Sequence, residues 1–382
     1  MKKLIAVIGV LAFTAGIAVA EDPKNKSDIQ QTGKHHYAEV NQTDGKIESY
    51  VIQSNKHNSA IVNQTMESGD DVDKILSNIN QSGKYNEAIV EQIHDRDWEW
   101  QYAGPGGLIE TYINQSGNHN MAKQIQGDHR QLGNLYAEID QSGNHNWAEQ
   151  NQQARGNSAY INQGGNNNEA YQAQDTELPP EALGSMNYAL IDQAGNHNHA
   201  AQQQNGWSMD AEIYQGGNSN EALQMQDGWV NDAYISQDGN NNWAVQDQYG
   251  DLNYGSIVQS SNNNIAEQHQ ISTGKGSNPY VPINYGEIEQ KGGNHNKAYQ
   301  TQTSGYPGGK TEDGILNEAI IWQDGGNNWA EQVQNYKNNY SKIDQLGDHN
   351  SADVYQNGSN PNWSEIMQHG NHNTAIVNQL NP

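Results

Sequence analysis

The sequence contains no cysteine, and its single phenylalanine, Phe13, lies near the amino terminus. Without cysteine the chain has neither disulfide bonds nor a thiol nucleophile, so backbone hydrogen bonds and packing must hold it together. Hydrophobic residues make up only 33% of the chain, and such a share by itself favours disorder because little apolar surface is available to offset chain entropy. A regular repeat avoids that outcome, since stacked units share one core.

The only long apolar run belongs to the first twenty residues. Lys2 and Lys3 precede an apolar stretch from Leu4 to Ala15, and Ala18-Val19-Ala20 forms a small-x-small cleavage site before Glu21. This pattern predicts a secretory signal peptide over residues 1–20. We expect a short segment at 21–26 and a repeat domain over 27–382, with no later stretch apolar enough to cross a bilayer.

Positive charge is scarce. The chain has 19 Lys and Arg against 45 Asp and Glu, a formal net charge of −26. Loss of the two lysines in the signal peptide leaves 17 basic residues against 45 acidic ones, a net charge of −28. This balance argues against nucleic acid and anionic membranes as partners. It favours solubility before any assembly.

Motifs of catalysis and cofactor binding are missing as well. The sequence has no P-loop, no dinucleotide fingerprint, no His-Glu-x-x-His motif and no Gly-Gly-x-Gly-x-Asp calcium repeat. We therefore predict a protein that is not an enzyme and has no catalytic residues, no cofactor and no resident metal.

What the sequence does contain is one pattern repeated fourteen times: small-x-Ile-x-Gln-x-Gly-x-x-Asn-x-Ala-x-x-x-Gln. We number its columns from the first Gln, at position 0. The fourteen anchors are Gln31, Gln53, Gln81, Gln115, Gln141, Gln163, Gln193, Gln215, Gln237, Gln259, Gln290, Gln323, Gln345 and Gln368. Position −4 is small, −2 is Ile in thirteen copies, +5 is Asn except for His36 in the first copy, +7 is Ala, +9 is Gln or Val, and +11 is Gln. In the copy at Gln290 one extra residue, beside Gly292-Gly293, delays Ala298 by one position.

The spacing of these columns is that of β-strands. The inward residues recur every second position on both sides of a Gly-x-x turn, which predicts strand, turn, strand, turn in each copy. We expect glycine to supply the positive φ of the turn. The predicted fold is all-β, a β-solenoid of fourteen strand-turn-strand coils that stack in register as two facing parallel sheets.

Stacking explains why the columns are invariant. In a stack each column becomes a ladder of like residues about 4.8 Å apart, and a buried amide is satisfied by the identical amide of the next coil. The alternative, an antiparallel hairpin within each copy, gives no reason for identity. The predicted structural ladder comprises Ile161, Gln163, Asn168, Ala170, Gln174, Ile213, Gln215, Asn220, Ala222, Gln226, Ile235, Gln237, Asn242, Ala244 and Gln248.

The large insertions fall between the last Gln of one copy and the small residue of the next. Examples are 93–110, 175–188, 271–285 and 303–318. Because they join the same pair of strands, they should all project from one edge of the solenoid. This edge is either a site of specific contacts or simply a place where loop growth is tolerated.

The pattern Gln-x-Gly-x-x-Asn-x-Ala-x-x-x-Gln resembles the curlin repeat of curli subunits, over Ser27 to Gln379. The resemblance implies secretion by the Sec route and through an outer-membrane pore, followed by polymerisation at the bacterial cell surface into amyloid fibres of biofilm matrix and adhesion. It also implies a nucleator subunit as a partner. This chain differs from familiar curlins in its number of repeats and in the brevity of the segment at 21–26.

Two functions remain open at this point. The first is a fibre subunit that adds to itself end to end, because the last copy matches the consensus and both ends present like columns without a distinct cap. A matrix polysaccharide is a further partner of such a fibre. The second is a monomeric, surface-displayed binding module that uses the insertion edge.

Three further columns invite hypotheses. Histidines recur in the first turn, where they either bind Zn²⁺ or Cu²⁺ as a row or merely suit the turn. The outward Trp147, Trp243 and Trp329 share a column that either binds sugars or strengthens contacts between coils. Outward acids, by repelling one another in the stack, would delay assembly, unless they form only a solvated face. They are Asp140, Asp192, Asp238, Asp344 and Asp353.

Overall fold

The computed structural model describes residues 25–43, 45–66, 74–94, 107–128, 134–153, 156–176, 186–273, 283–304, 317–358 and 361–381. Every regular element in these ranges is a β-strand, which confirms the all-β prediction. Within the same ranges no helix is long and apolar enough to span a membrane. The predicted signal peptide, the start of the 21–26 segment and the central parts of the long insertions lie outside the described residues.

The chain divides into two compact units, Met1–Thr176 and Glu177–Pro382. The strands of the N-terminal unit are β1 (Asn25–Lys34), β2 (Tyr37–Thr43), β3 (Ile47–Lys56), β4 (Ser59–Met66), β5 (Lys74–Lys84), β6 (Glu87–His94), β7 (Leu108–Asn118), β8 (Met121–Asp128), β9 (Leu135–Asn144), β10 (Trp147–Gln153), β11 (Asn157–Gln163) and β12 (Glu169–Asp175).

The strands of the C-terminal unit are β13 (Asn187–Gln193), β14 (His199–Trp207), β15 (Asp210–Gln215), β16 (Glu221–Trp229), β17 (Asp232–Gln237), β18 (Trp243–Tyr249), β19 (Asn253–Gln259), β20 (Ile265–Ser272), β21 (Asn284–Gly292), β22 (Lys297–Ser304), β23 (Asn317–Gly325), β24 (Trp329–Tyr336), β25 (Asn339–Leu346), β26 (Ser351–Gly358), β27 (Asn362–His369) and β28 (Thr374–Asn381). Two consecutive strands form one coil, so β1 and β2 are coil 1 and β27 and β28 are coil 14.

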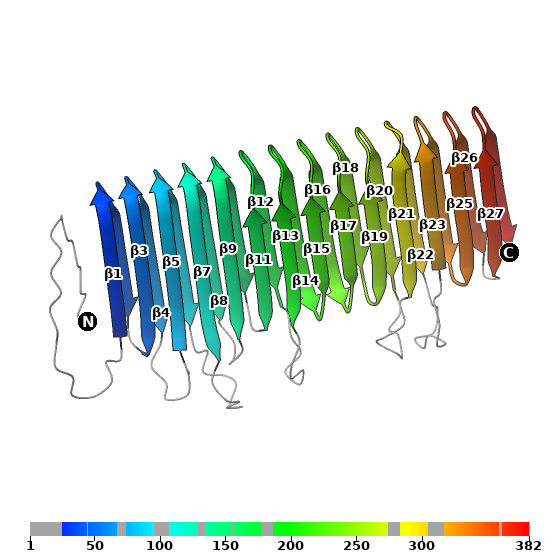
Figure 1. The fold of residues 1–382 in the computed structure, drawn as a ribbon. Helices are drawn as coiled ribbons and strands as arrows, with labels where there is room; N and C mark the ends of the chain where they lie inside the picture. Colours follow the sequence, from blue (N-terminus) through cyan, green and yellow to red (C-terminus); the bar gives the residue numbers. More distant parts are fainter. Residues whose placement is uncertain are drawn as a thin grey trace, which may run out of the picture. The chain divides into compact units, whose positions relative to one another are not determined.

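Within each unit the odd-numbered strands form one sheet and the even-numbered strands another (Figure 1). Each strand pairs in parallel with the equivalent strand of the next coil, in a register that places like residues together. Gln141 thus lies beside Gln163, and Ile213 beside Ile235. The two strands of one coil belong to different sheets, so the stacked solenoid is confirmed and the hairpin alternative is wrong.

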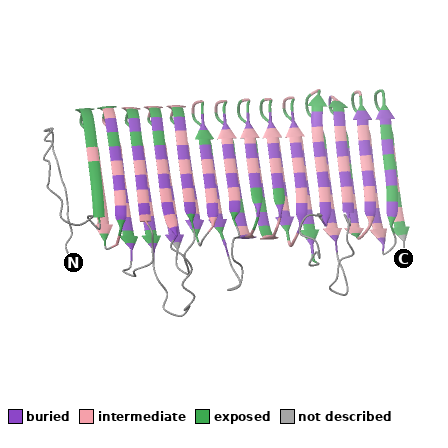
Figure 2. Cartoon of the chain, turned by 60° about the horizontal axis from the view of Figure 1, so that its bottom comes forward, coloured by how far each residue is buried: buried purple, intermediate pink, exposed green. Residues whose placement is uncertain are grey.

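The core lies between the two sheets of each unit. Buried positions alternate along the strands with half-buried or exposed ones, as period two requires (Figure 2). The inward columns combine isoleucine and alanine with fully buried glutamine and asparagine. The core is therefore thin and largely polar, and its stability depends on pairing every amide.

The turn between the two strands of a coil uses an unexpected residue for its left-handed conformation. The residue just before the Asn column has φ between 55° and 63° in every coil, and it is His, Asn, Tyr or Ser but never Gly. Histidine and asparagine tolerate this region better than most residues. The glycine two positions after the anchor has positive φ only in some coils, such as Gly117 at 105°.

Where that glycine has an ordinary φ, its role is steric. A Cβ placed on Gly217 would collide with the carbonyl oxygen of Gly239 in the next coil. The expectation that glycine supplies positive φ is thus wrong for coils such as this one, in which close stacking of the turns requires it. The extra residue at Gly292-Gly293 is absorbed in the turn, because Gln290 still pairs with Gln323 and Ala298 with Ala330.

Candidate functional site

The anchor glutamines form a continuous amide ladder within each unit. The Nε2 of Gln215 donates to the Oε1 of Gln237 at 2.9 Å, and the Nε2 of Gln237 donates to the Oε1 of Gln259 at 2.9 Å. The second N–H of each amide crosses the core, as in the bond from Gln215 to the backbone oxygen of His199 at 3.1 Å. Each side chain therefore joins successive coils and also ties the two sheets together.

Two further ladders run along the even-numbered strands. At position +11 the Nε2 of Gln226 donates to the Oε1 of Gln248 at 2.9 Å and to the backbone oxygen of Asp210 at 2.8 Å. At position +9 the Nε2 of Gln224 donates to Gln246 at 3.1 Å. The donor always belongs to the earlier coil, so the ladders are polar and all three run in one direction.

The structure places all the predicted ladder residues inward and buries them. Ile161 and Gln163 pair with Ile139 and Gln141 in the N-terminal unit, and the residues of coils 8 and 9 pair with one another. The buried set is Ile161, Gln163, Asn168, Ala170, Gln174, Ile213, Gln215, Asn220, Ala222, Gln226, Ile235, Gln237, Asn242, Ala244 and Gln248. That these residues carry assembly remains a prediction.

The sequence reasoning missed one buried column, at position −6. In the C-terminal unit it carries an asparagine ladder in which Asn284 donates to Asn253 at 2.8 Å. In coils 2 to 5 of the N-terminal unit the same column is apolar, and Ile47, Ile75, Ile109 and Leu135 pack with Met66. The signal was available, since period two from the small residue reaches this position, but its two residue types concealed it.

The asparagines at +5 connect the turns of successive coils. The backbone N–H of Asn220 donates to the Oδ1 of Asn198 at 2.9 Å, while its Nδ2 donates to the backbone oxygen of Gly239 in the following coil at 2.8 Å. Each asparagine thus contacts the coils on both sides. These bonds explain why the column is nearly invariant.

The turn histidines stack instead of forming a chelating group. The rings of His35 and His57 have centroids 4.8 Å apart and lie 8° from parallel, and Tyr85 continues the stack at 4.7 Å. Burial and neighbouring positive charges lower the pKa of His57. Throughout the described parts of the chain no group of three or more His, Cys, Asp or Glu side chains could hold a metal ion.

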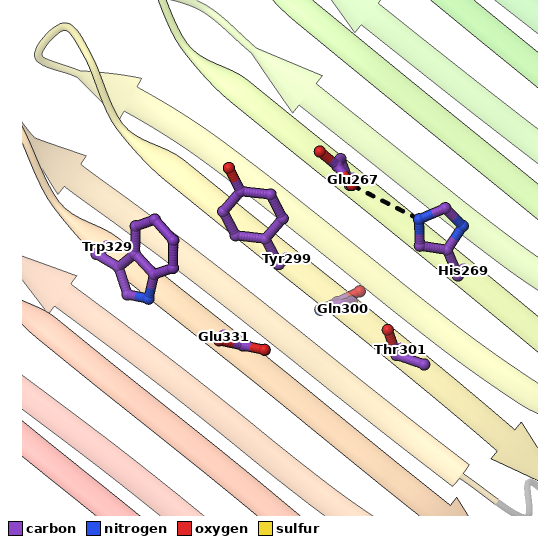
Figure 3. Close-up of a pocket in the computed structure, with 7 residues that line it drawn as sticks. All are labelled: Glu267, His269, Tyr299, Gln300, Thr301, Trp329 and Glu331. Carbon is purple, nitrogen blue, oxygen red and sulfur yellow. Dashed lines mark ion pairs between the residues drawn. The ribbon is translucent and has the colours of Figure 1, made fainter.

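A shallow depression lies on the outward face of β20, β22 and β24 (Figure 3). The rings of Tyr299 and Trp329 pack with centroids 5.0 Å apart. The Nδ1 of His269 lies 3.0 Å from a carboxylate oxygen of Asp247, and its Nε2 lies 3.7 Å from Glu267. These carboxylates, with the Asp247 hydrogen bond foremost, raise the pKa of His269. Trp329 thus contacts the neighbouring coil, and the binding of sugars by this column stays a prediction.

Two carboxylates are stacked in register on the outer face of β15 and β17. Asp210 lies beside Asp232 in the next coil. Burial, together with the charges of Glu212 and Asp232, raises the pKa of Asp210 to about 6. Among the acids selected from the sequence, Asp192 has a pKa raised by burial. Asp140 instead accepts a 2.7 Å hydrogen bond from Asn114.

In the first and last coils, the side chains of the ladder columns are more exposed than the equivalent side chains in the coils between them. Ile29, Val40 and Val377 are half-buried, whereas the equivalent Ile213 and Val62 are fully buried. β1 pairs only with β3 in the part of the chain that the structure describes, and β28 only with β26. Each of these strands therefore offers one edge of backbone donors and acceptors, together with ladder side chains, to a further strand.

Stacked parallel coils with two facing sheets define a β-solenoid repeat protein. Within that class, residues 347–380 match the family model of the curlin associated repeat. The match contains β26 and β27 and nearly all of β28, so the predicted curlin-type repeat is confirmed, and the strand pattern of the described residues agrees with fourteen copies. No curated protein matches the chain at a significant level.

Proposed function

We propose that this protein is a structural subunit of curli-type extracellular amyloid fibres and that it assembles end to end by templated stacking of its coils. The observation that carries the proposal is that, among the described strands, β1, β2, β27 and β28 each have a pairing partner on one side alone, and that Ile29, Val40 and Val377 of the ladder columns are half-buried there. The curlin associated repeat at residues 347–380 supports an extracellular, structural role.

The physical mechanism is templated stacking. An incoming chain that folds on an existing end pairs its backbone groups and its amides at once, whereas a chain alone must order a coil with no partner. Nucleation is therefore slow and elongation fast. Because the contact joins two different ends, it does not close on itself and produces filaments.

Several partners follow from this role. A curli-type outer-membrane pore would export the chain after removal of residues 1–20, and a nucleator subunit would supply the first template. A matrix polysaccharide would contact the outer faces of the fibre, which would support biofilm and adhesion. No catalytic step is part of the proposal.

The test is to follow the purified chain from Glu21 onward at neutral pH. We expect long unbranched fibres by electron microscopy, binding of an amyloid dye, and a lag phase that preformed fibres abolish. A chain that stays monomeric at high concentration would contradict the proposal and favour the surface-displayed binding module.

A further inference from the structure

The depression on the outward face of β20, β22 and β24 combines aromatic rings with carboxylates (Figure 3). Tyr299 lies in register between Glu267 of the preceding coil and Glu331 of the following coil. The Trp329 ring packs beside it, with the two ring centroids 5.0 Å apart. Burial, followed by the charges of Glu267 and Glu331, raises the pKa of Tyr299. The surface here is therefore aromatic in the middle and negatively charged on both sides.

The carboxylates along this face outnumber the cationic groups beside them. His269 contacts both Asp247 and Glu267, so a single imidazole serves two carboxylates. Glu331 forms no hydrogen bond or ion pair with any residue that the structure describes. Asp353 of the next coil lies beside Glu331 in register, and its Oδ1 is buried without a hydrogen-bond partner. Four carboxylates thus accompany one imidazole, which leaves negative charge uncompensated even when that imidazole is protonated.

One lysine of the same sheet lies close by without neutralising this charge. Lys297 is in register with Trp329, in the column next to the depression. Its side chain is exposed, does not line the depression and forms no ion pair within the described part of the chain. The depression therefore has an aromatic wall and acceptors for a cation, but none of the lysines that the structure describes lines it.

The other sheet of the same unit contains a similar group of side chains together with its cation. The Nζ of Lys342 lies 3.9 Å from the centroid of the Trp322 ring. The Nε1 of Trp322 donates to a carboxylate oxygen of Glu287 at 3.0 Å. A primary ammonium group over an indole ring, beside a glutamate, is thus an arrangement that this protein already forms within itself.

Organic cations suit such a depression better than other ligands. The faces of aromatic rings attract ammonium groups that lie within about 6 Å of the ring centroid. Carboxylates accept short, charge-assisted hydrogen bonds from the N–H groups of the same cation. Anions would be repelled, and a bare metal ion would find no group of three suitable ligands among the described residues. The net charge of −26 further raises the concentration of cations near the surface.

We propose that this depression binds a primary ammonium group carried by a larger organic ligand, either an amino sugar or a polyamine. The ammonium group would contact Glu331 and Tyr299, and the apolar carbons beside it would pack on Trp329, whose side chain is 37% exposed. Thr301, which also lines the depression, offers a hydroxyl to a polar group of the ligand. For the amino sugar the inference rests on the proposed function, since it specifies that a matrix polysaccharide held here has free amines.

The test compares ligands that differ in a single charged group. The purified chain from Glu21 onward, as monomer or as fibres, is titrated calorimetrically at low salt with a glucosamine hexasaccharide and with its fully N-acetylated form. Acetylation removes the positive charge and keeps the sugar ring, so we expect the free-amine form to bind at least about ten times more tightly. Equal affinities would overturn the inference.

Spermidine, titrated in the same way, distinguishes the two sources of the ammonium group. It presents primary ammonium groups on a flexible chain without a sugar ring. Tighter binding of spermidine than of the free-amine saccharide would assign the depression to polyamines, and weaker binding would assign it to amino sugars. Failure of both ligands to bind would overturn the inference.

A matched pair of charge variants separates this site from diffuse attraction to an acidic protein. Glu331→Gln should weaken binding of the free-amine saccharide by about threefold to tenfold. Glu91→Gln removes the same charge from an outward position between Asn63 and Ile125, away from any aromatic pair, and should leave the affinity nearly unchanged. Equal weakening by the two variants would overturn the inference.

A second pair of variants tests the aromatic ring without changing the charge. Trp329→Leu should weaken binding about as much as the loss of the carboxylate. Trp147→Leu is the control, because Trp147 occupies the same column but the nearby Glu149 is already paired with Lys123 at 3.3 Å. Equal effects of the two leucine variants would contradict the assignment. Because the titration needs only folded coils, absence of fibres would contradict the proposed function and leave this test intact.

Discussion

At the scale of the residue, the molecule depends on glutamines that no single coil can satisfy. Gln237 accepts from Gln215 at 2.9 Å, donates to Gln259 at 2.9 Å and also donates to the backbone oxygen of Glu221 at 3.0 Å. It is fully buried. A buried amide is expensive unless every group is paired, so identity along the column is a physical requirement.

Replacing Gln237 by leucine should destabilise the folded C-terminal unit by about 2–5 kcal/mol, because it leaves one buried N–H and one buried oxygen of the neighbours without partners. Chemical unfolding, or the soluble concentration left at the end of assembly, measures the effect. The same change at the outward, exposed Gln203 is the control and should have little effect. Equal effects at both positions would show that the ladder contributes nothing.

Because acidic side chains are stacked in register, the stability of the folded protein should depend on pH. Because the pKa of Asp210 is raised to about 6 in the folded protein, the stability that it contributes is fully present below its unfolded pKa of about 3.9 and is lost as pH rises through about 6. Asp210→Asn should therefore stabilise the protein at pH 7, and its advantage should vanish near pH 4.

Unfolding curves of wild type and Asp210→Asn from pH 4 to pH 8 test this expectation. Asp238→Asn is the control, since the neighbours of Asp238 in its column are Gly216 and Ser260. A constant difference between wild type and Asp210→Asn across the range would refute the role of the stacked carboxylates.

At the scale of the element, the coil is the repeating unit, and the coils have two core types. Position +9 is Gln and position −4 is Ala, Gly or Thr in coils 4 to 12, whereas position +9 is Val and position −4 is Ser in coils 1 to 3, 13 and 14. The facing columns −4 and +9 change together, and the change leaves the Oε1 of Gln124 without a partner. Within a block of like coils each +9 side chain meets an identical neighbour. The cost of a substitution at +9 should therefore depend on the neighbouring coils more than on the coil itself.

For this reason, replacing valine by glutamine at position +9 should affect stability differently in coils 2 and 3. Val90→Gln moves the change of core type by one coil, because the new amide can donate to Gln124, so we expect little change in stability. Val62→Gln creates an isolated glutamine between valines and adds a buried acceptor without a donor, which should cost about 1–3 kcal/mol more. Thermal or chemical unfolding of the two variants gives the difference, and equal stabilities would contradict the boundary argument.

At the scale of the whole molecule, charge opposes assembly and the ladders favour it. The chain carries a net charge of −26, so copies that approach one another repel. Two copies form hydrogen bonds between their backbone groups and between their side-chain amides only after this repulsion is overcome. The negative charge thus keeps free chains apart, which suits the proposed export before assembly.

Salt should therefore accelerate fibre formation. Raising the ionic strength from 0.01 to 0.15 M shortens the Debye length from about 30 Å to about 8 Å, so the lag phase at neutral pH should shorten. Dye-binding kinetics over this range check the effect, with sucrose at equal osmolality as the control. A lag that lengthens with salt would show that attraction between opposite charges, rather than repulsion, governs the encounter.

The sequence by itself determined the coil and its stacking. The period of two, the turn and the identical columns are local or repeated, and a buried glutamine in fourteen copies can be satisfied only by its equals, so the in-register solenoid followed. The tertiary structure alone decided what depends on groups across the core or on backbone geometry. It revealed the buried −6 column and the left-handed conformation at the turn histidines. Those features depend on neighbours that are distant along the chain. The spacing of residues within one strand does not show which residues of the facing strand they contact.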